Sequence, residues 1–462
     1  MPDKQFFETV PSPGLAHLSY MVGHRGRAAV IDPRRDVQAY IDLAKKHDCR
    51  IAHIFETHRN EDYVIGSCEL QRATGADIHH GEGMEWGYGQ TVSAGDTFAL
   101  GSLKLKILQT PGHTDDSISI TLADTDFADD PIAVFSGDAL FVGDVGRTDF
   151  YPDRPEEVAG LLYDSIFETL LPLGDGVLLC PAHGAGSVCG SGMASRDFSS
   201  LGYERRFNPA LQVDSRDEFI RNKVNEHHYV PPYFSRMEEY NQHGTAPAMP
   251  ALPSPPALDA EEFARSAEKD AVIVDIREPE AFSGGFVPGS LNIPADMIPA
   301  YAGWLVPYDK DILLVADDPS DVTGAVRPFI RLGYDRLAGY LRGGLHGWEV
   351  TGREIDTIGI VTARELSDRL KGENPPTLLD VRKNEEWTAG HLESAEHVYL
   401  GYLPEHVDEV SDGKGVITFC GSGRRASIAA SILRRQGVRE VSNNLGSMAA
   451  CQAIGCEVSS ES

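Results

Sequence analysis

The sequence predicts an α/β protein with three domains, and three observations lead to this fold class. The chain has 462 residues, whereas a single hydrophobic core seldom serves more than roughly 250 residues. Apolar runs typical of strands alternate with helix-like segments, and a proline-rich stretch precedes a C-terminal part in which one pattern occurs twice. We therefore expect an N-terminal α/β sandwich over residues 1–243, a linker over 244–258, and smaller α/β domains over 259–356 and 357–462.

Four polar segments follow strand-like runs in the N-terminal part. The runs lie at residues 51–55, 103–108, 132–135 and 177–179, and the segments after them are 57–63, 110–113, 136–138 and 181–184. Helix-like segments at 37–47 and 155–171 alternate with these runs. Because side chains on loops that leave a sheet at one edge can converge in a crevice, the histidines and carboxylates of the four segments predict a metal site.

The proline-rich stretch covers residues 244–258, where five of fifteen residues are proline. Proline has no backbone N–H and a fixed φ, so this stretch disfavours a helix or a central strand. We expect an extended, semi-stiff spacer and place the first domain boundary there.

An internal repeat follows the spacer. Residues 271–277 end in Asp-Ile-Arg and residues 377–382 end in Asp-Val-Arg, and the spacing between Asp275 and Asp380 suits two small domains. Further echoes pair 286–294 with 391–398, the strand-like run 312–316 with 416–420, and the helix-like segment 323–332 with 425–435.

The order of the N-terminal polar segments resembles the metallo-β-lactamase superfamily. That superfamily begins with His-x-His-x-Asp-His and continues with single His, Asp and His ligands, and its fold is an αββα sandwich. Here the first motif runs from His58 to Tyr63, with Asn60 and Tyr63 in place of the second and third histidines. An amide and a neutral phenol are poor ligands, so this departure argues against a pair of zinc ions that activates a bridging hydroxide.

His58, His113 and Asp138 remain, and two histidines with one carboxylate form the facial triad of mononuclear non-haem Fe(II). These positions match the iron ligands of persulfide dioxygenases, the oxygen-using branch of the superfamily. The resemblance therefore implies one Fe(II) per chain. Asp62 and His183 are expected either to orient a ligand or an incoming oxygen species, or to be remnants of a second metal position.

Two further residues near these segments are candidates for function. The segment 143–150 contains Gly-Arg-Thr-Asp-Phe, which also resembles the persulfide dioxygenases. Its Arg147 is our candidate for binding a substrate carboxylate or phosphate, because guanidinium makes planar two-pronged contacts with either anion. Cys189, shortly after His183, is either a sulfur carrier between centres or a packed loop thiol.

The repeat resembles tandem rhodanese domains, through its Asp-x-Arg strand ends and the Gly-Gly-Leu-His-Gly-Trp run that ends at Trp348. In the second copy, Cys420 follows a strand and opens a loop ahead of a helix. The loop consists of Gly421, Ser422, Gly423, Arg424 and Arg425. Its backbone N–H groups, the helix N-terminus and the arginines favour a thiolate, so Cys420 is the predicted nucleophile and persulfide carrier. Related phosphatases have five residues between cysteine and arginine, whereas four separate Cys420 from Arg425, which favours sulfur over phosphate.

The first copy has no cysteine at the equivalent turn, residues 316–321. Three aspartates there, Asp317, Asp318 and Asp321, would repel a thiolate or a sulfur oxyanion. We expect this domain to be catalytically silent and to have a scaffolding role, such as docking the iron domain to the active rhodanese.

Together the resemblances imply a sulfide-detoxifying enzyme with two activities. A low-molecular-weight persulfide, dioxygen and water would give sulfite and thiol, and Cys420 would move sulfur from a second persulfide to the sulfite, which yields thiosulfate. The sequence leaves the thiol open, because Gly184 and Ala185 replace the Asp-Tyr typical of relatives specific for glutathione persulfide. Two other classes also stay open: a glyoxalase II-type thioester hydrolase with an appended sulfurtransferase, and a non-catalytic binding module that serves the rhodanese.

Charge and composition exclude some partners. The net charge of −29 repels phosphate backbones and anionic membranes, so we expect neither nucleic acid nor a membrane as partner. The N-terminus lacks a signal-like pattern and no long apolar stretch occurs, which favours a cytoplasmic protein. Seven scattered cysteines form neither a disulfide framework nor a zinc pattern. The family resemblance also implies a homo-oligomer.

Overall fold

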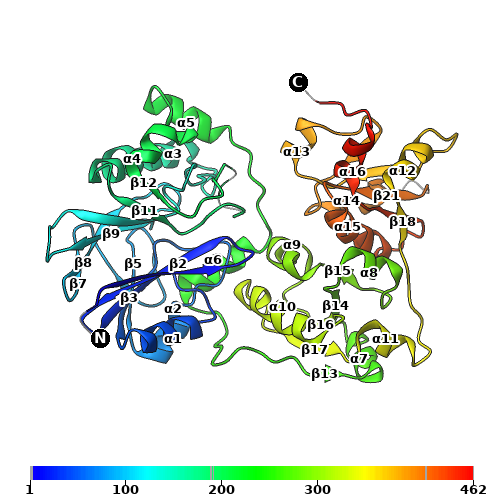
Figure 1. Cartoon of the computed structure of the whole chain (residues 1–462), viewed down its shortest axis with the longest axis horizontal. Coiled ribbons are helices and arrows are strands. Elements are labelled where there is room, and N and C mark those ends of the chain that lie inside the picture. Colours follow the sequence, from blue (N-terminus) through cyan, green and yellow to red (C-terminus); the bar gives the residue numbers. More distant parts are fainter. Residues whose placement is uncertain (1–3, 188–189, 191, 411–413, 461–462) are drawn as a thin grey trace. The chain divides into compact units, whose positions relative to one another are not determined.

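The structure is a computed structural model that describes residues 4–187, 190, 192–410 and 414–460. The chain forms two compact units, coloured from blue to green and from green to red in Figure 1. The first unit comprises Met1–Leu252 with Ile330–Gly333, and the second comprises Pro253–Phe329 with Tyr334–Ser462. Among the described residues, no helix has both the length and the apolar character needed to span a bilayer.

Two mixed sheets of six strands form the centre of the first unit. The first sheet has the order β1 (Phe6–Ser12), β2 (His17–His24), β3 (Arg27–Ile31), β4 (Arg50–Phe55), β5 (Asp77–His80) and β6 (Gln90–Thr91). The second has the order β12 (Ser199–Ser200), β11 (Leu178–Pro181), β10 (Pro131–Gly137), β9 (Ile118–Asp124), β8 (Leu103–Gln109) and β7 (Thr97–Leu100). The four strand-like runs before the polar segments are thus β4 in one sheet and β8, β10 and β11 in the other.

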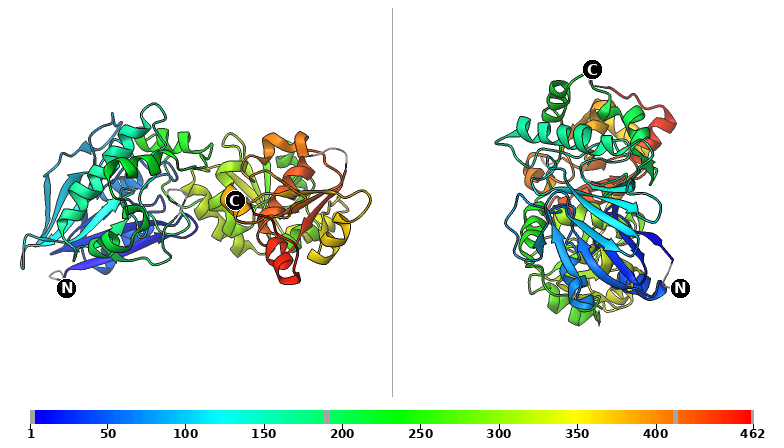
Figure 2. Two further views of the ribbon diagram at one scale, coloured as in Figure 1. Left: turned by 90° about the horizontal axis from the view of Figure 1, so that it is seen from above. Right: turned by 90° about the vertical axis from the view of Figure 1, so that its left-hand side faces the viewer.

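Helices flank both sheets, so the layers run helix, sheet, sheet, helix, as Figure 1 and the right-hand view of Figure 2 both show. The first sheet is covered by α1 (Gln38–Lys46) and α2 (Ser67–Thr74). The second is covered by α3 (Pro155–Asp164), the π-helix η1 (Ser165–Leu170), the short helices η2 (Leu171–Leu173) and η3 (Pro209–Leu211), α4 (Leu201–Phe207) and α5 (Arg216–Val224). The last helix of the unit is α6 (Phe234–His243). This arrangement is the αββα sandwich that the sequence predicts.

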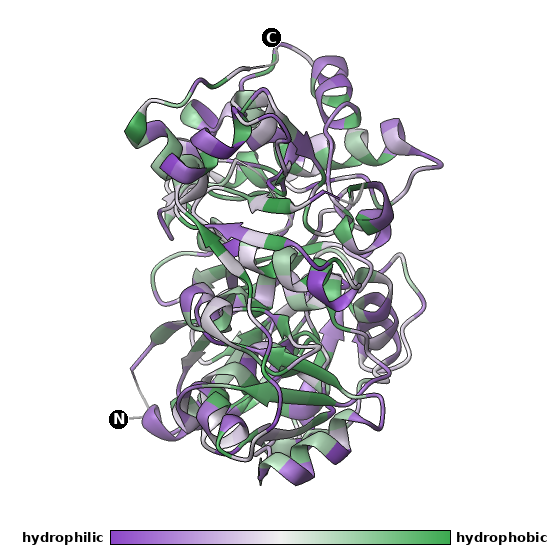
Figure 3. Ribbon diagram, turned by 90° about the vertical axis from the view of Figure 1, so that its right-hand side faces the viewer, coloured by the Kyte–Doolittle hydropathy of each residue, from purple (hydrophilic) through white to green (hydrophobic). Residues whose placement is uncertain are grey.

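Three apolar clusters fill the spaces between these layers. Side chains of β2, β3 and β4 meet those of β8, β9 and β10 between the sheets, where every residue of β9 is buried. Tyr40 and Leu70 join the first sheet to its helices, and Leu162 and Phe219 join the second sheet to its helices. In Figure 3 many strands are accordingly green, the colour of hydrophobic residues, whereas most helices alternate between green and purple along their turns.

The helix predicted over 155–171 forms in two parts. It begins with Pro155, which needs no N–H partner, and with Glu156 and Glu157, which offset the helix dipole. At Ser165 the α-helix changes to the wider π-helix, and the Ser165 hydroxyl donates to the carbonyl of Pro111 at 2.7 Å.

The second unit contains two parallel five-stranded sheets with the same strand order. The first is β13 (Ala257–Leu258), β17 (Leu337–Leu341), β16 (Ile312–Val315), β14 (Val272–Asp275) and β15 (Leu291–Asn292). The second is β18 (Gly359–Val361), β22 (Val441–Asn444), β21 (Val416–Phe419), β19 (Thr377–Asp380) and β20 (Ala395–His397). The repeat seen in the sequence is therefore a repeat of topology.

Helices of the first copy are α7 (Ala260–Ala267), α8 (Pro279–Gly284), η4 (Ala295–Met297), α9 (Ile298–Leu305), α10 (Pro319–Arg331) and α11 (Gly344–Glu349). Those of the second are α12 (Ala363–Leu370), α13 (Asn384–Ala389), α14 (Leu403–Val410), α15 (Arg424–Arg435) and α16 (Ser447–Ile454). The first helix of each copy starts with a capping box, formed by Asp259 with Glu262 and by Thr362 with Glu365.

One part of the predicted spacer is a strand. Residues 257–258 form β13 at the edge of the first parallel sheet, and the N–H of Tyr340 donates to the carbonyl of Pro256 at 2.9 Å. Proline lacks a donor but keeps its acceptor, so an edge position accommodates it.

The two Asp-x-Arg motifs form the same buried clamp in both copies. Arg382 donates from Nε and from a terminal nitrogen to both oxygens of Asp380, at 2.6–3.0 Å, and also to the carbonyl of Gly390 at 2.8 Å. Arg277 makes the equivalent bonds to Asp275 at 2.6–3.1 Å. Each motif thereby fixes the turn that follows its strand.

The two copies also contact one another through α15. Asn292 of the first copy donates its N–H to Ser431 Oγ at 3.0 Å, and Ser427 Oγ donates to Asn292 Oδ1 at 2.7 Å. All three residues are fully buried.

Candidate metal centre and sulfur loop

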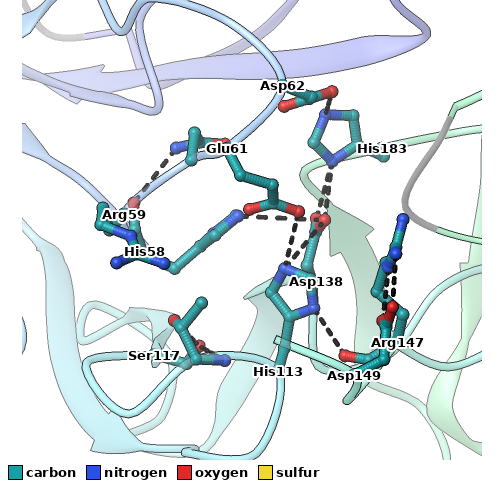
Figure 4. A network of polar contacts seen from close by, with 12 residues as sticks. His58, Arg59, Glu61, Asp62, His113, Ser117, Asp138, Arg147, Asp149 and His183 are labelled. Atoms are coloured by element: carbon teal, nitrogen blue, oxygen red, sulfur yellow. Dashed lines mark hydrogen bonds and ion pairs between the residues drawn. The ribbon is translucent and has the colours of Figure 1, made fainter. Parts of the chain in front are cut away.

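The loops after β4, β8, β10 and β11 bring their polar side chains to one buried place in the first unit. Figure 4 shows His58, Glu61, His113 and Asp138 pointing toward one another, with His183 and Asp62 beyond Asp138. All six residues are at most 1% exposed. The sheets thus position the predicted ligands and exclude bulk water from them.

Distances within this cluster are short enough for one ion. Asp138 Oδ2 lies 3.7 Å from His113 Nε2 and 3.9 Å from His58 Nε2, and Glu61 Oε1 lies 3.4 Å from His113 Nε2. One potential ligand atom each from His58, Glu61 and His113 all lie within 4.8 Å of one another. Ligands held 2.0–2.2 Å from an ion are separated by roughly 3 Å, so the cluster is only slightly wider than a coordination sphere.

His58 is oriented from behind by Thr57. The Thr57 hydroxyl uses its hydrogen to donate to Asp32 Oδ2 at 2.8 Å. Toward His58 Nδ1, 3.0 Å away, it therefore acts as the acceptor, and the ring N–H is on Nδ1. The Thr57 N–H also donates to Asp32, at 2.7 Å. His58 Nε2 therefore carries a lone pair that faces the cluster.

His113 is oriented in the same way, with a backbone carbonyl as the acceptor. Its Nδ1 donates to the carbonyl oxygen of Arg147 at 2.9 Å, which leaves the Nε2 lone pair toward Glu61 and Asp138. The Arg147 side chain is buried and makes a two-pronged pair with Asp149 at 2.6 and 2.7 Å, and it lies over the ring of Phe150. The structure thus shows Arg147 holding a predicted ligand through its backbone, while its guanidinium, our candidate for the substrate anion, is bound to Asp149.

Asp138 is held by His183. The Nδ1 of His183 lies 2.8 and 2.9 Å from the two oxygens of Asp138, and its Nε2 lies 3.1 Å from Asp62 Oδ2. The attraction of both carboxylates outweighs the effect of burial and raises the pKa of His183 well above its usual value. A charged imidazole therefore joins Asp62 to Asp138 on the side away from His58.

Asn60 and Tyr63 point elsewhere. The Asn60 amide donates to the carbonyl of His58 at 3.1 Å, and the Tyr63 hydroxyl bonds to His17 Nε2 at 2.9 Å. These hydrogen bonds direct both side chains to partners other than the ligand atoms of His58, His113 and Asp138.

Electrostatics favour a cation in this cluster. Burial lowers the pKa of His58 to about 4, so its imidazole is neutral. Without an ion, a proton on His113 faces Glu61. Burial raises the pKa of Glu61, but the attraction and hydrogen bond of His113 together with the attraction of His58 outweigh burial and lower that pKa to about 2. Nε2 of His58 and Nε2 of His113 accept no hydrogen bond from the described residues. Buried lone pairs that face carboxylates are unfavourable unless a proton or a metal ion lies between them, so the residues fit a divalent cation.

The sulfur loop lies in the second unit, between β21 and α15. The N–H of Gly423 donates to Cys420 Sγ at 3.1 Å, and the N–H of Cys420 donates to Ser447 Oγ at 3.1 Å. Gly423 has a φ of 95°, and a β-carbon there would lie 3.1 Å from Leu445 Cα, so this turn requires glycine. Cys420 is fully buried in this cradle.

Both arginines of the loop are paired with carboxylates. Arg425 forms a two-pronged pair with Glu386 at 2.5 and 2.8 Å. Arg424 pairs with Asp296 and with Glu278, both from the first copy. Tyr301, also from the first copy, lies at Arg425, and burial raises its pKa to about 12. The first copy thus supplies side chains to the surroundings of Cys420.

The remaining residues to consider are the cysteines and two acidic residues near the cluster, Glu61 and Asp32. Cys189 lies outside the described residues, whereas the six described cysteines are free thiols. The sequence reasoning omitted Glu61, although it stands inside the first motif. It also omitted Asp32, whose position directly after the apolar run 28–31 was a usable signal.

The chain matches known protein families in its N-terminal part and in both copies of the repeat. Residues 12–185 match the metallo-beta-lactamase superfamily, and residues 259–351 and 362–453 match the rhodanese-like domain. A solved structure titled as a metallo-beta-lactamase from Staphylococcus aureus subsp. aureus COL is 32% identical with a TM-score of 0.66, over 73% of this chain and 99% of that one. The predicted fold class is thereby confirmed.

Two curated relatives each match a part of the chain. Persulfide dioxygenase ETHE1, mitochondrial, from Mus musculus is 29% identical over 238 residues, which is 47% of this chain and 78% of the mouse protein. Hydroxyacylglutathione hydrolase from Rhodospirillum rubrum is 33% identical over 148 residues, which is 30% of this chain and 51% of the hydrolase.

Proposed function

Because the chain belongs to the metallo-β-lactamase superfamily and carries two rhodanese-like domains, we propose that it is a persulfide dioxygenase coupled to sulfur transfer. The proposed ion is one Fe(II), held by His58, His113 and Asp138. The observation that carries the proposal is the ligand set. Two imidazole lone pairs and a carboxylate converge, while Asn60 and Tyr63 turn away from the place where a second ion would need them.

The proposed oxidation consumes a low-molecular-weight persulfide, dioxygen and water, and releases sulfite and thiol. A ferrous ion held by His58, His113 and Asp138 would supply the redox chemistry that activates dioxygen toward the persulfide sulfur. The protein holds the ligands in place. Thr57 and the Arg147 carbonyl fix the two imidazoles, His183 fixes Asp138, and burial keeps bulk solvent from these side chains.

The proposed transfer takes place at Cys420. Its thiolate attacks the outer sulfur of a second persulfide, so that a new S–S bond forms at Cys420 and the thiol leaves. The sulfur lone pair of sulfite then attacks that outer sulfur, which releases the Cys420 thiolate and thiosulfate. The Gly423 N–H, which donates to Cys420 Sγ, supports the thiolate at both stages.

Metal analysis and oxygen uptake test the oxidation. The protein is purified without oxygen, its metals are measured, and it is then given glutathione, coenzyme A or cysteine persulfide in separate assays. We expect about one iron per chain and oxygen consumption with sulfite release. Two zinc ions per chain, with thioester hydrolysis and no oxygen uptake, would establish the hydrolase suggested by the Rhodospirillum relative.

A Cys420→Ser variant tests the coupling. We expect oxygen uptake to continue at the wild-type rate while sulfite accumulates in place of thiosulfate. Thiosulfate formation at the wild-type rate in this variant would show that the sulfur does not pass through Cys420.

A further inference from the structure

We propose that the Glu61 carboxylate is a fourth ligand of the metal ion and takes the place left by the missing imidazole at position 60. This inference rests on the proposed centre of His58, His113 and Asp138. It adds a second carboxylate, so the ligand set becomes two histidines with two acids.

The position of Glu61 supports this role. Its Oε1 lies 3.4 Å from His113 Nε2, which is closer than the 3.7 Å between Asp138 Oδ2 and the same nitrogen. Figure 4 shows the Glu61 carboxylate on the side of the two imidazoles, directed into the cluster. Glu61 is fully buried, and a buried ionised carboxylate needs a paired charge or a metal.

The turn that carries Glu61 is fixed by a residue far along the chain. Asn241 of α6 donates to the carbonyls of Asn60 and Tyr63 at 2.6 and 2.7 Å, and it accepts from the N–H of Ile65 at 3.0 Å. These three bonds hold residues 60–65 in one conformation. The Asn60 side chain is turned onto its own turn, and Glu61 extends toward the ligands instead.

A fourth ligand changes the charge and the free positions of the centre. With Asp138 alone, a ferrous site has a net charge of +1, whereas Asp138 and Glu61 together make it neutral. A six-coordinate ion with four protein ligands keeps two positions, which suffice for one sulfur and one dioxygen. We therefore expect Glu61 to raise the affinity for the ion without blocking the proposed reaction.

Metal affinity of variants tests the inference without any substrate. Glu61→Gln and Glu61→Asp are compared with wild type by competition with a chromophoric chelator for Fe(II) and for Co(II) under anaerobic conditions. We expect Glu61→Gln to weaken binding at least about tenfold, because even residues behind a ligand affect metal affinity by 10–100-fold. The absorption spectrum of bound Co(II) should change as well, because one oxygen ligand is lost.

Glu238→Gln is the matched control. Glu238 pairs with Arg59 at 2.9 Å, next to the same motif, but it is not among the converging residues. The same chemical change there should leave affinity within about twofold and leave the Co(II) spectrum unaltered.

Glu61→Asp keeps the charge and shortens the side chain by one methylene, so it provides a test even if Glu61→Gln does not fold. We expect weaker binding and a shifted Co(II) spectrum in folded Glu61→Asp. Wild-type affinity together with a wild-type spectrum in either folded variant would overturn the inference. A protein that binds iron through Glu61 but consumes no oxygen with persulfides would overturn only the proposed dioxygenase.

Discussion

Replacing Asp380 by asparagine tests the contribution of the Asp-x-Arg clamp to the active copy. Asp380 and Arg382 are 0% and 4% exposed, so water does not compensate for a lost charge. Asparagine keeps the shape and one acceptor but leaves the Arg382 guanidinium without its counter-charge. Loss of one partner from a buried ion pair costs about 3–5 kcal/mol, and the remaining acceptor places the expected value near the lower end, about 3 kcal/mol.

This free energy corresponds to a large shift in melting temperature. For a domain of about 100 residues, 1 kcal/mol changes Tm by roughly 4–8 °C, so we expect a fall of roughly 12–24 °C. Calorimetry of the full chain should show one transition move. Thiosulfate formation should be lost over the same temperature range, while oxygen uptake by the first unit persists.

Asp275→Asn is the matched control, because the same clamp occurs in the first copy, which contains no counterpart of Cys420. It should lower stability by a similar amount, but sulfur transfer through Cys420 should survive below the new transition. A shift of less than roughly 4 °C in Asp380→Asn, equivalent to under 1 kcal/mol, would refute the argument that the clamp stabilises the domain.

Three further changes have distinct readouts. Burial lowers the pKa of His79 to about 4, below the value of 6.5 in the unfolded chain. The free energy of unfolding should therefore fall as the pH drops from 6.5 to 4, by at most about 3 kcal/mol. Unfolding in guanidinium chloride should show a weaker dependence of this free energy on pH for His79→Phe. Gly423→Ala should slow sulfur transfer at least about tenfold, equal to roughly 1.4 kcal/mol, with unchanged metal content, and a normal transfer rate would contradict the tight turn. Arg147→Lys should weaken metal binding about tenfold, because lysine cannot make the two-pronged contact with Asp149 that positions the carbonyl on His113. Normal metal binding with a raised KM for persulfide would instead assign Arg147 to the substrate.

Local patterns predict most of the fold. The apolar runs before the polar segments form β4, β8, β10 and β11. They can be predicted because a buried strand requires several apolar residues close together in the sequence. The repeat predicts two domains of one topology for the same reason. The division of these strands between two sheets is not predicted, since pairing depends on residues far apart along the chain. The predicted spacer includes β13, because a strand of two residues directly after two prolines has no pattern that distinguishes it from an extended linker.

The candidate site shows the same limit. The positions of the polar segments at strand ends predict that their side chains converge, whereas the choice of His58, His113 and Asp138 among them comes from the family resemblance. The direction of Glu61 does not follow, because it depends on Asn241, which lies 180 residues later. Arg147 and Asp149 are both visible in the sequence, but their pairing depends on side-chain conformation.

The contact of Asn292 with Ser427 and Ser431 joins the first copy to α15, the helix behind the sulfur loop. An isolated fragment that began at residue 357 would expose the buried face of α15 and leave Ser431 without the N–H that it accepts. The first copy therefore has a structural role in this unit although its equivalent turn contains no cysteine. Truncated or chimaeric versions of this protein should therefore keep both rhodanese-like domains together.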